Sequence, residues 1–223
     1  MKKHNGITNS ILDLVGDTPL LRLNKITKEL DGQFLAKYEA FNPGHSMKDR
    51  IAKHIVDQAE KRGILKKGSK VIETTSGNTG FSIALVCIIK GYECILAVNS
   101  KASKGKINML KSMGAKVYVC PANVSADDPR SYYQVAKRLH EETADSVYIN
   151  QYFNELNSEA HYLSTGPEIW EQTDGKVTHV VAASGTGGTI SGVSNALKEK
   201  NKDIKIFLSD PKGSALYNYI KNG

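Results

Sequence analysis

The stretch KVIETTSGNTGFSIALVCIIKGYECILAV, residues 70–98, decides the fold class of this chain. Two short runs rich in β-branched residues, 70–73 and 93–98, are typical of strands. Between them, residues 80–90 form an apolar segment long enough for a helix, and Gly91 follows it as expected at a helix end. A strand, a helix and a strand in this order predict a βαβ unit with parallel strands.

The same alternation continues through the rest of the sequence. Further strands are predicted at residues 116–120, 178–183 and 205–208, and further helices at 47–62, 103–113, 131–142, 159–172 and 190–200. Most of the strand runs are apolar throughout, as expected when helices cover both faces of a parallel sheet. The chain is therefore predicted to have an α/β fold, and the segment 150–158 is a plausible crossing between two α/β lobes.

Composition narrows the class of protein. The chain has 223 residues, of which 40% are hydrophobic and 24% charged, as in globular domains. The apolar stretch 81–89 is shorter than the roughly 20 residues of a membrane span, and no apolar run follows the basic N-terminus as in a signal peptide. We therefore expect a cytoplasmic protein without a membrane-spanning segment. The formal charge of +7 is not accompanied by interleaved aromatic residues, so no nucleic-acid partner is predicted.

Neither disulfides nor a metal site are predicted. Cys87, Cys94 and Cys120 lie in apolar runs without a C-x-x-C pair, which indicates buried, reduced thiols. The six histidines show no metal-ligand spacing, so no metal is assigned. His45, three positions before Lys48, is either a packing residue or a neighbour of a site.

Residues 42–50, NPGHSMKDR, contain the first candidate for chemistry. Asn-Pro-Gly favours a turn, and Ser46 to Asp49 fits a capping box at the start of a helix. Lys48 is then in the first turn, where the helix dipole and the nearby Arg50 disfavour its charged form. A neutral lysine is a nucleophile that can form a Schiff base with an aldehyde cofactor. Taken alone, the pattern also fits an ordinary exposed lysine.

The second candidate is TTSGNTG, residues 74–80, between a strand and an apolar helix. Unpaired amides at the helix start, with the hydroxyls of Thr75, Ser76 and Thr79, suit an anion such as a substrate carboxylate. The Asn78 amide is suited to a ring hydroxyl. A capped turn without any ligand is the alternative.

The third candidate is the loop SGTGGT, residues 184–189, again between a strand and a helix. Successive backbone amides in such a loop can bind a phosphate, and Thr186 and Thr189 add hydroxyl donors. Ile190 stands where the dinucleotide motif G-x-G-x-x-G requires its last glycine, and the P-loop signature is absent. A phosphate site is therefore favoured over a dinucleotide or nucleotide site, and a tight connection without ligand remains the alternative.

Three motifs in this order, SMKDR at 46–50, TSGNTG at 75–80 and GTGGT at 185–189, resemble the cysteine synthase and cystathionine β-synthase family. The resemblance extends from GDTPL at 16–20 to DPKGS at 210–214, nearly the whole chain.

The resemblance implies a fold-type II architecture, like that of the tryptophan synthase β subunit. Two parallel-sheet α/β lobes would hold pyridoxal 5'-phosphate (PLP) in the cleft between them. The smaller, mobile lobe would span residues 42–150, and residues 1–41 plus 151–223 would form a larger lobe whose C-terminal part is missing.

The resemblance also implies a role for each matching residue. Lys48 looks like the catalytic residue that forms the Schiff base, and Asn78 like the contact to the cofactor's ring hydroxyl. The phosphate loop would consist of Gly185, Thr186, Gly187, Gly188 and Thr189. The clamp on the substrate carboxylate would consist of Thr75, Ser76, Thr79 and Gln151.

The implied reaction replaces the β-substituent of serine or an O-activated serine with a thiol or sulfide, giving cystathionine or cysteine. The segment 127–139 is nearer to the cystathionine synthases, whereas Gly44 and His45 before Ser46 leave the donor open. β-Elimination, as in serine or threonine dehydratases, and binding of PLP or a nucleotide without catalysis are the alternatives. Relatives are commonly dimers, so a homodimer acting on small amino-acid and thiol substrates is expected.

Overall fold

The computed structural model describes residues 6–75 and 77–222. Contacts between residues divide the chain into two compact units, Lys2–Asn154 and Glu155–Gly223. The lobe boundaries implied by the resemblance remain a prediction. In the described part of the chain, no helix is both long and apolar enough to span a membrane.

A four-stranded sheet forms the centre of the first unit. Its order is β5-β4-β3-β6 and every neighbouring pair is parallel, as predicted. In the register of β3 and β4, Thr75 lies opposite Val98, so the carboxyl ends of the two central strands are adjacent. The strands are β3 (Lys70–Thr75), β4 (Glu93–Asn99), β5 (Lys116–Cys120) and β6 (Ser146–Tyr148).

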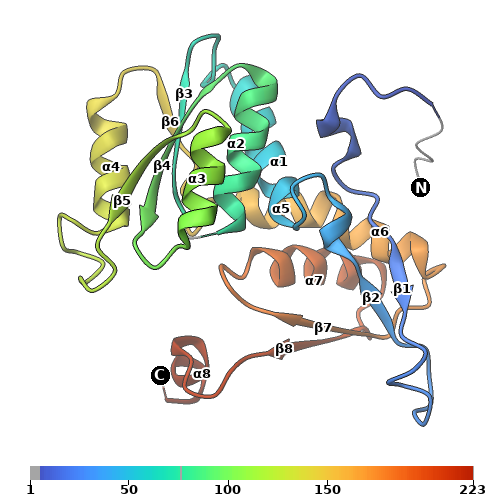
Figure 1. Ribbon diagram of the computed structural model, residues 1–223. Coiled ribbons are helices and arrows are strands. Elements are labelled where there is room, and N and C mark those ends of the chain that lie inside the picture. The colour runs from blue at the N-terminus through green and yellow to red at the C-terminus, as the bar shows by residue number, and fades with distance from the viewer. Residues whose placement is uncertain (1–5, 76, 223) are drawn as a thin grey trace. The chain divides into compact units, whose positions relative to one another are not determined.

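Helices cover both faces of this sheet. Figure 1 shows α4 on one face and α2 with α3 on the other, and α1 packs against α2. The α4 face holds a core of Ile72, Ile95, Ala97, Cys120, Val135 and Ala136. The helices are α1 (Lys48–Lys61), α2 (Asn78–Lys90), α3 (Lys104–Ser112) and α4 (Tyr132–Glu142). β3 and β4 are buried along nearly their whole length, and the three cysteines are buried and free, both as predicted.

The first unit also contains short elements that the sequence did not indicate. β1 (Leu20–Arg22) and β2 (Leu35–Lys37) form an antiparallel pair, and η1 (Ile11–Leu14) and η2 (Glu39–Phe41) are single 3-10 turns. Each has only three or four residues, too few for a period of two or of 3.6 to be recognised. β6 escaped prediction for the same reason.

In the second unit, the helix predicted at 159–172 is two helices, α5 (Leu156–Leu163) and α6 (Thr165–Gln172). Ser164 between them has φ −128° and ψ −69°, outside helical geometry. Pro167 explains the break, because in a continuous helix its ring would collide with the carbonyl of Leu163 and its missing N–H would leave that carbonyl unpaired. At the third position of a new helix, proline loses no hydrogen bond.

The rest of the second unit is a two-stranded parallel sheet with helices. Its elements are β7 (His179–Ala183), α7 (Gly188–Lys200), β8 (Lys205–Ser209) and α8 (Ala215–Asn222). Val193 and Leu197 of α7 and Ile204 form its core. Burial alternates along β7, and Val181 is 69% exposed in the described structure, so one face of this strand is open here.

Candidate functional site

The loop between β3 and α2 is held from within by Thr75. Its hydroxyl oxygen accepts hydrogen bonds from the amides of Gly77 at 3.1 Å and Gly80 at 3.0 Å. Thr75 therefore fixes the first turn of α2, where helix amides without helical partners favour an anion. The predicted contribution of Ser76 lies outside the described residues.

Thr79 and Gln151, predicted to share a substrate carboxylate, are brought together although 72 residues separate them. The Thr79 hydroxyl donates to Gln151 Oε1 at 2.9 Å, and Gln151 Nε2 donates to the Thr74 carbonyl at 3.3 Å. Both side chains are buried, with 6% of each residue exposed. The start of α2 and the turn that follows β6 are thus joined at the carboxyl edge of the sheet.

Glu73, which was not predicted to belong to the site, stabilises the contact between the start of α2 and the turn after β6. One carboxylate oxygen accepts the Gln151 amide at 3.1 Å, and the other accepts the Thr74 amide at 2.6 Å and the Thr74 hydroxyl at 3.0 Å. The residue is completely buried, and burial raises the pKa of Glu73 to about 7 against the lowering effect of these hydrogen bonds. The sequence does contain a signal for this role, because Glu73 is an acidic residue inside a strand that is otherwise predicted to be buried.

Glu73 makes the stability of the fold depend on pH. Its folded-state pKa of about 7 exceeds the ordinary glutamate value of 4.5, so ionisation of Glu73 penalises the folded state as pH rises between these values. We expect the Glu73 contribution to the wild-type unfolding free energy to fall by about 3 kcal/mol from pH 4.5 to 8, because each pKa unit corresponds to about 1.4 kcal/mol. In Glu73→Gln this component should vanish. Urea unfolding at several pH values measures both slopes, and parallel curves would contradict the assignment.

Lys48 lies in the first turn of α1, as predicted, and is the first residue of that helix. Its backbone amide donates to Ser46 Oγ at 3.2 Å. Within the described residues its side-chain amine makes no hydrogen bond or ion pair, and burial lowers the pKa of Lys48. Arg50, expected to disfavour the lysine's charge, is itself neutralised by Glu39, so burial is the main cause.

Asp49 connects Lys48 to the start of α2. Its carboxylate accepts the Ser82 hydroxyl at 2.5 Å, and Ser82 Oγ also lies 3.1 Å from the carbonyl oxygen of Asn78. The capping box predicted for Ser46 and Asp49 is therefore wrong, because Asp49 binds Ser82 and the Gly44 amide instead of the Ser46 amide. The tertiary contact places the nucleophile candidate at a fixed position relative to Asn78.

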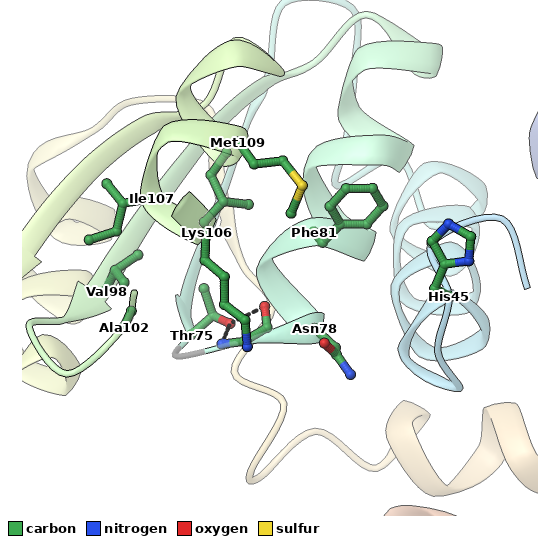
Figure 2. A pocket seen from close by; sticks show the side chains of 12 residues that line it. His45, Thr75, Asn78, Phe81, Val98, Ala102, Lys106, Ile107 and Met109 are labelled. Atoms are coloured by element: carbon green, nitrogen blue, oxygen red, sulfur yellow. Dashed lines mark hydrogen bonds between the residues drawn. The ribbon is translucent and has the colours of Figure 1, made fainter. Parts of the chain in front are cut away.

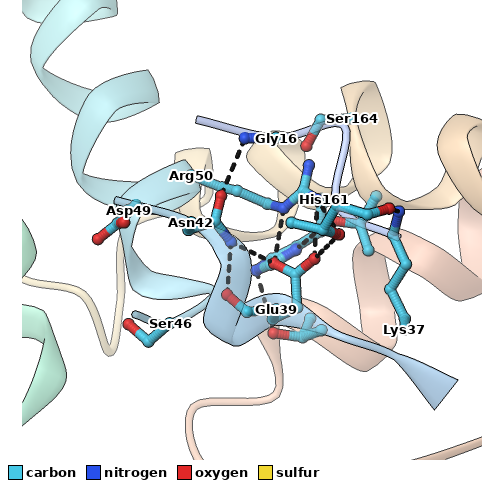
Figure 3. A network of polar contacts seen from close by, with 12 residues as sticks. Gly16, Lys37, Glu39, Asn42, Ser46, Asp49, Arg50, His161 and Ser164 are labelled. Carbon is cyan, nitrogen blue, oxygen red and sulfur yellow. Dashed lines mark hydrogen bonds and ion pairs between the residues drawn. The ribbon is translucent and has the colours of Figure 1, made fainter. Parts of the chain in front are cut away.

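A buried ion pair holds the segment that leads to Lys48 (Figure 3). Arg50 Nε donates to one Glu39 oxygen at 2.7 Å, and a terminal guanidinium nitrogen donates to the other at 2.8 Å. The Thr18 hydroxyl and the Asn42 amide also donate to this carboxylate, at 2.6 Å and 3.0 Å. Burial alone would raise the pKa of Glu39, but the Arg50 contacts hold it below its usual value.

A cavity of about 300 Å³ adjoins the β3–α2 loop (Figure 2). Thr75, Gly77 and Asn78 line one end, and His45 contributes from the turn before α1. Within the described residues the exposed Asn78 amide has no hydrogen-bond partner, so it is available to a ligand. His45 therefore lies near the candidate site.

The predicted phosphate loop connects β7 to α7. Gly187 has φ +83°, a left-handed conformation that glycine adopts without strain, and no other atom would obstruct a side chain at Gly185. Open backbone at a helix N-terminus is suited to a phosphate group. With the Lys48 amine, these donors fit the chemistry of a phosphorylated aldehyde.

Two residues of α5 hold the threonines of this loop, and neither was predicted. Asn157 Nδ2 donates to Thr186 Oγ1 at 2.9 Å, and His161 Nε2 lies 3.0 Å from Thr189 Oγ1. His161 is fully buried. These two residues could not be recognised from the loop motif, because Asn157 is 29 residues before Thr186 and His161 is 28 residues before Thr189.

These features define an α/β protein with two loops at helix starts whose backbone suits an anion, and with a lysine amine of lowered pKa at a third helix start. Comparison with known families is consistent with that chemistry. The family model described as pyridoxal-phosphate dependent enzyme matches residues 11–223, and the chain belongs to this family. The resemblance stated from the motifs is thereby confirmed.

Individual relatives are similar along nearly the whole chain. Cysteine synthase 1 of Emericella nidulans is 44% identical over 219 residues, 98% of this chain. A cystathionine beta-synthase of Apis mellifera is 44% identical over 212 residues, 94% of this chain. The chain spans 59% of the first relative's length and 42% of the second's.

Solved structures confirm the predicted fold class. The cysteine synthase of Entamoeba histolytica matches with a TM-score of 0.88 and 37% identity, over 98% of this chain and 65% of that one. A hydrogen sulfide-producing enzyme of Fusobacterium nucleatum matches with a TM-score of 0.88 and 33% identity, over 96% of this chain and 68% of that one.

Proposed function

We propose that this chain catalyses PLP-dependent β-replacement on serine or an O-activated serine, with a thiol or sulfide as acceptor. The products would be cystathionine or cysteine. The observation that carries the proposal is the Lys48 amine, which burial keeps at a lowered pKa and which Asp49 and Ser82 tie to the start of α2. The names of the relatives support the same reaction class.

The cofactor contributions are assigned residue by residue. When bound, PLP supplies an electron sink that makes the substrate α-proton acidic. Lys48 would bind the cofactor through its amine and later carry the α-proton at Nζ. Asn78 would donate to the ring hydroxyl. The phosphate would be bound by Gly185, Thr186, Gly187, Gly188 and Thr189.

The substrate carboxylate would bind at the start of α2, with Thr75, Ser76, Thr79 and Gln151 around it. The Thr75 hydroxyl already accepts two loop amides, and the Thr79 hydroxyl donates to Gln151. These contacts favour backbone amides of the helix start as carboxylate donors, with the threonines holding the loop in shape. Preorganised donors of this kind orient the substrate before its α-proton is removed.

Titration of the purified chain with PLP tests the function. We expect a visible absorption band, a change of that band on addition of serine or O-acetylserine, and formation of cystathionine or cysteine when homocysteine or sulfide follows. Pyruvate formed from serine at the same rate with and without thiol would indicate elimination instead. A chain that stays colourless with PLP would refute the proposal.

We also propose that the protein is a cytoplasmic homodimer, as the resemblance implies. The burial of Cys87, Cys94 and Cys120 as free thiols is compatible with a reducing compartment. Light scattering after size-exclusion chromatography measures the mass in solution, and a monomeric mass would contradict the dimer.

A further inference from the structure

The cavity beside the β3–α2 loop is lined mostly by apolar side chains. From Thr75, Gly77 and Asn78 it continues between α2 and α3, and Figure 2 shows Phe81 and Met109 on its far side. Its volume of about 300 Å³ is near the lower end for small-molecule pockets. Its apolar wall consists of Phe81, Val98, Ala102, Ile107, Met109 and Leu110. Such a wall suits the methylene groups of a second substrate.

A second, polar cavity of about 420 Å³ adjoins the first, because Ala102 and Lys106 line both. Lys101, Ser103 and Tyr132 contribute to it. Neither lining includes an aspartate or glutamate among the described residues. The two cavities therefore combine an apolar wall with a region of positive charge.

Lys106 is placed to act on a ligand of this double cavity. Figure 2 shows its side chain directed toward the end of β3 and the start of α2. Within the described chain its amine has no hydrogen bond or ion pair, whereas Lys53, Lys90 and Lys116 are each paired with carboxylates. An unpaired ammonium beside an apolar wall is complementary to a carboxylate on a short carbon chain.

We propose that the acceptor of the reaction is an organic thiol that carries a carboxylate, and that Lys106 is the residue that selects it. This inference rests on the proposed function and specifies its second substrate. The thiol sulfur forms the new C–S bond with the β-carbon, the C–O electron pair departs with the leaving group, and the thiol proton is released with it. Hydrosulfide has neither methylene groups nor a carboxylate, so it would contact neither the apolar wall nor the Lys106 ammonium.

Binding of unreactive probes tests this selection without catalysis. 3-(Methylthio)propionate carries the proposed carboxylate, and 3-(methylthio)propanol is its neutral counterpart. We expect calorimetry to show that Lys106→Gln weakens binding of the carboxylate about tenfold or more, the value of one charged hydrogen bond, and changes binding of the alcohol little. Lys104→Gln removes the same charge two residues earlier on α3, outside both linings, and is the matched control.

Equal affinity of the two probes, or equal losses in the Lys106 and Lys104 variants, would overturn the inference. Kinetics with the PLP-loaded chain separate it from the proposed function. Lys106→Gln should raise the ratio of KM for 3-mercaptopropionate to KM for hydrosulfide about tenfold. An unchanged ratio with a normal spectral response to serine or O-acetylserine rejects the acceptor assignment alone, whereas no response in wild type rejects the proposed function itself.

Discussion

Replacement of Lys48 by alanine is expected to abolish the visible band formed with PLP and the covalent adduct that borohydride traps. The band requires a nucleophilic amine, and burial lowers the pKa of Lys48, which increases its neutral fraction near pH 7. The rate of β-replacement should fall at least about a hundredfold, the lower range for loss of a general base. Spectroscopy, peptide mass mapping after reduction and product assays measure the three effects.

Two further variants separate chemistry from folding. Lys61→Ala removes an exposed lysine from the other end of α1 and should keep both band and adduct. Lys48→Arg retains a long cation that cannot deprotonate near neutral pH, so it should fold normally and form no adduct. An adduct mapped to another lysine in folded Lys48→Ala would disprove the assignment.

Much of the central fold could be predicted because residues 70–98 carry their own signals. β3, α2 and β4 are long, apolar and separated by glycines, and the structure reproduces them with ends shifted by one or two residues. The segment 159–172 was predicted as one helix because its residues follow a helical pattern on both sides of Pro167. The steric effect of Pro167 divides it into two helices.

The candidate site was predictable where residues are neighbours in sequence. Lys48 and Asn78 each occupy a helix start, and Gly187 adopts the left-handed conformation that a glycine-rich turn suggests. The supports were not predictable, because Glu73 reaches Gln151 across 78 residues. Short sequence motifs predict the residues that would face a ligand. The residues that position them are distant in sequence and can be identified only from tertiary contacts.

The Asp49 result shows how a local rule is overridden. A serine followed three residues later by an acidic residue, as in Ser46 and Asp49, is a good capping pattern. The Asp49 carboxylate nevertheless binds Ser82 and the Gly44 amide. A side chain at Gly44 would collide with that carboxylate, so the glycine is required by the contact. Asp49 thereby links the turn before Lys48 to α2, which a capping role would not do.

The Glu39–Arg50 pair connects folding to the candidate site, because it anchors the turn at 42–47 from which Lys48 extends. The Arg50 side chain is 2% exposed and that of Glu39 is 16% exposed. Removing one partner leaves a buried charge uncompensated, which typically costs about 3–5 kcal/mol. Glu39 has its pKa lowered, so the pair contributes above the unfolded pKa and its contribution is lost as pH falls.

Arg50→Met is therefore expected to lower the unfolding free energy by about 3–5 kcal/mol and to shift the urea midpoint accordingly. Arg130→Met is the matched control, since Arg130 pairs with Asp128 at 2.7 Å with a 70% exposed side chain, and loss of this exposed pair should change the unfolding free energy little. The double variant Glu39→Gln/Arg50→Met should lose less than the sum of the single variants, because it leaves neither charge unpaired. Additive losses, or equal losses at Arg50 and Arg130, would show that the buried pair does not hold this turn.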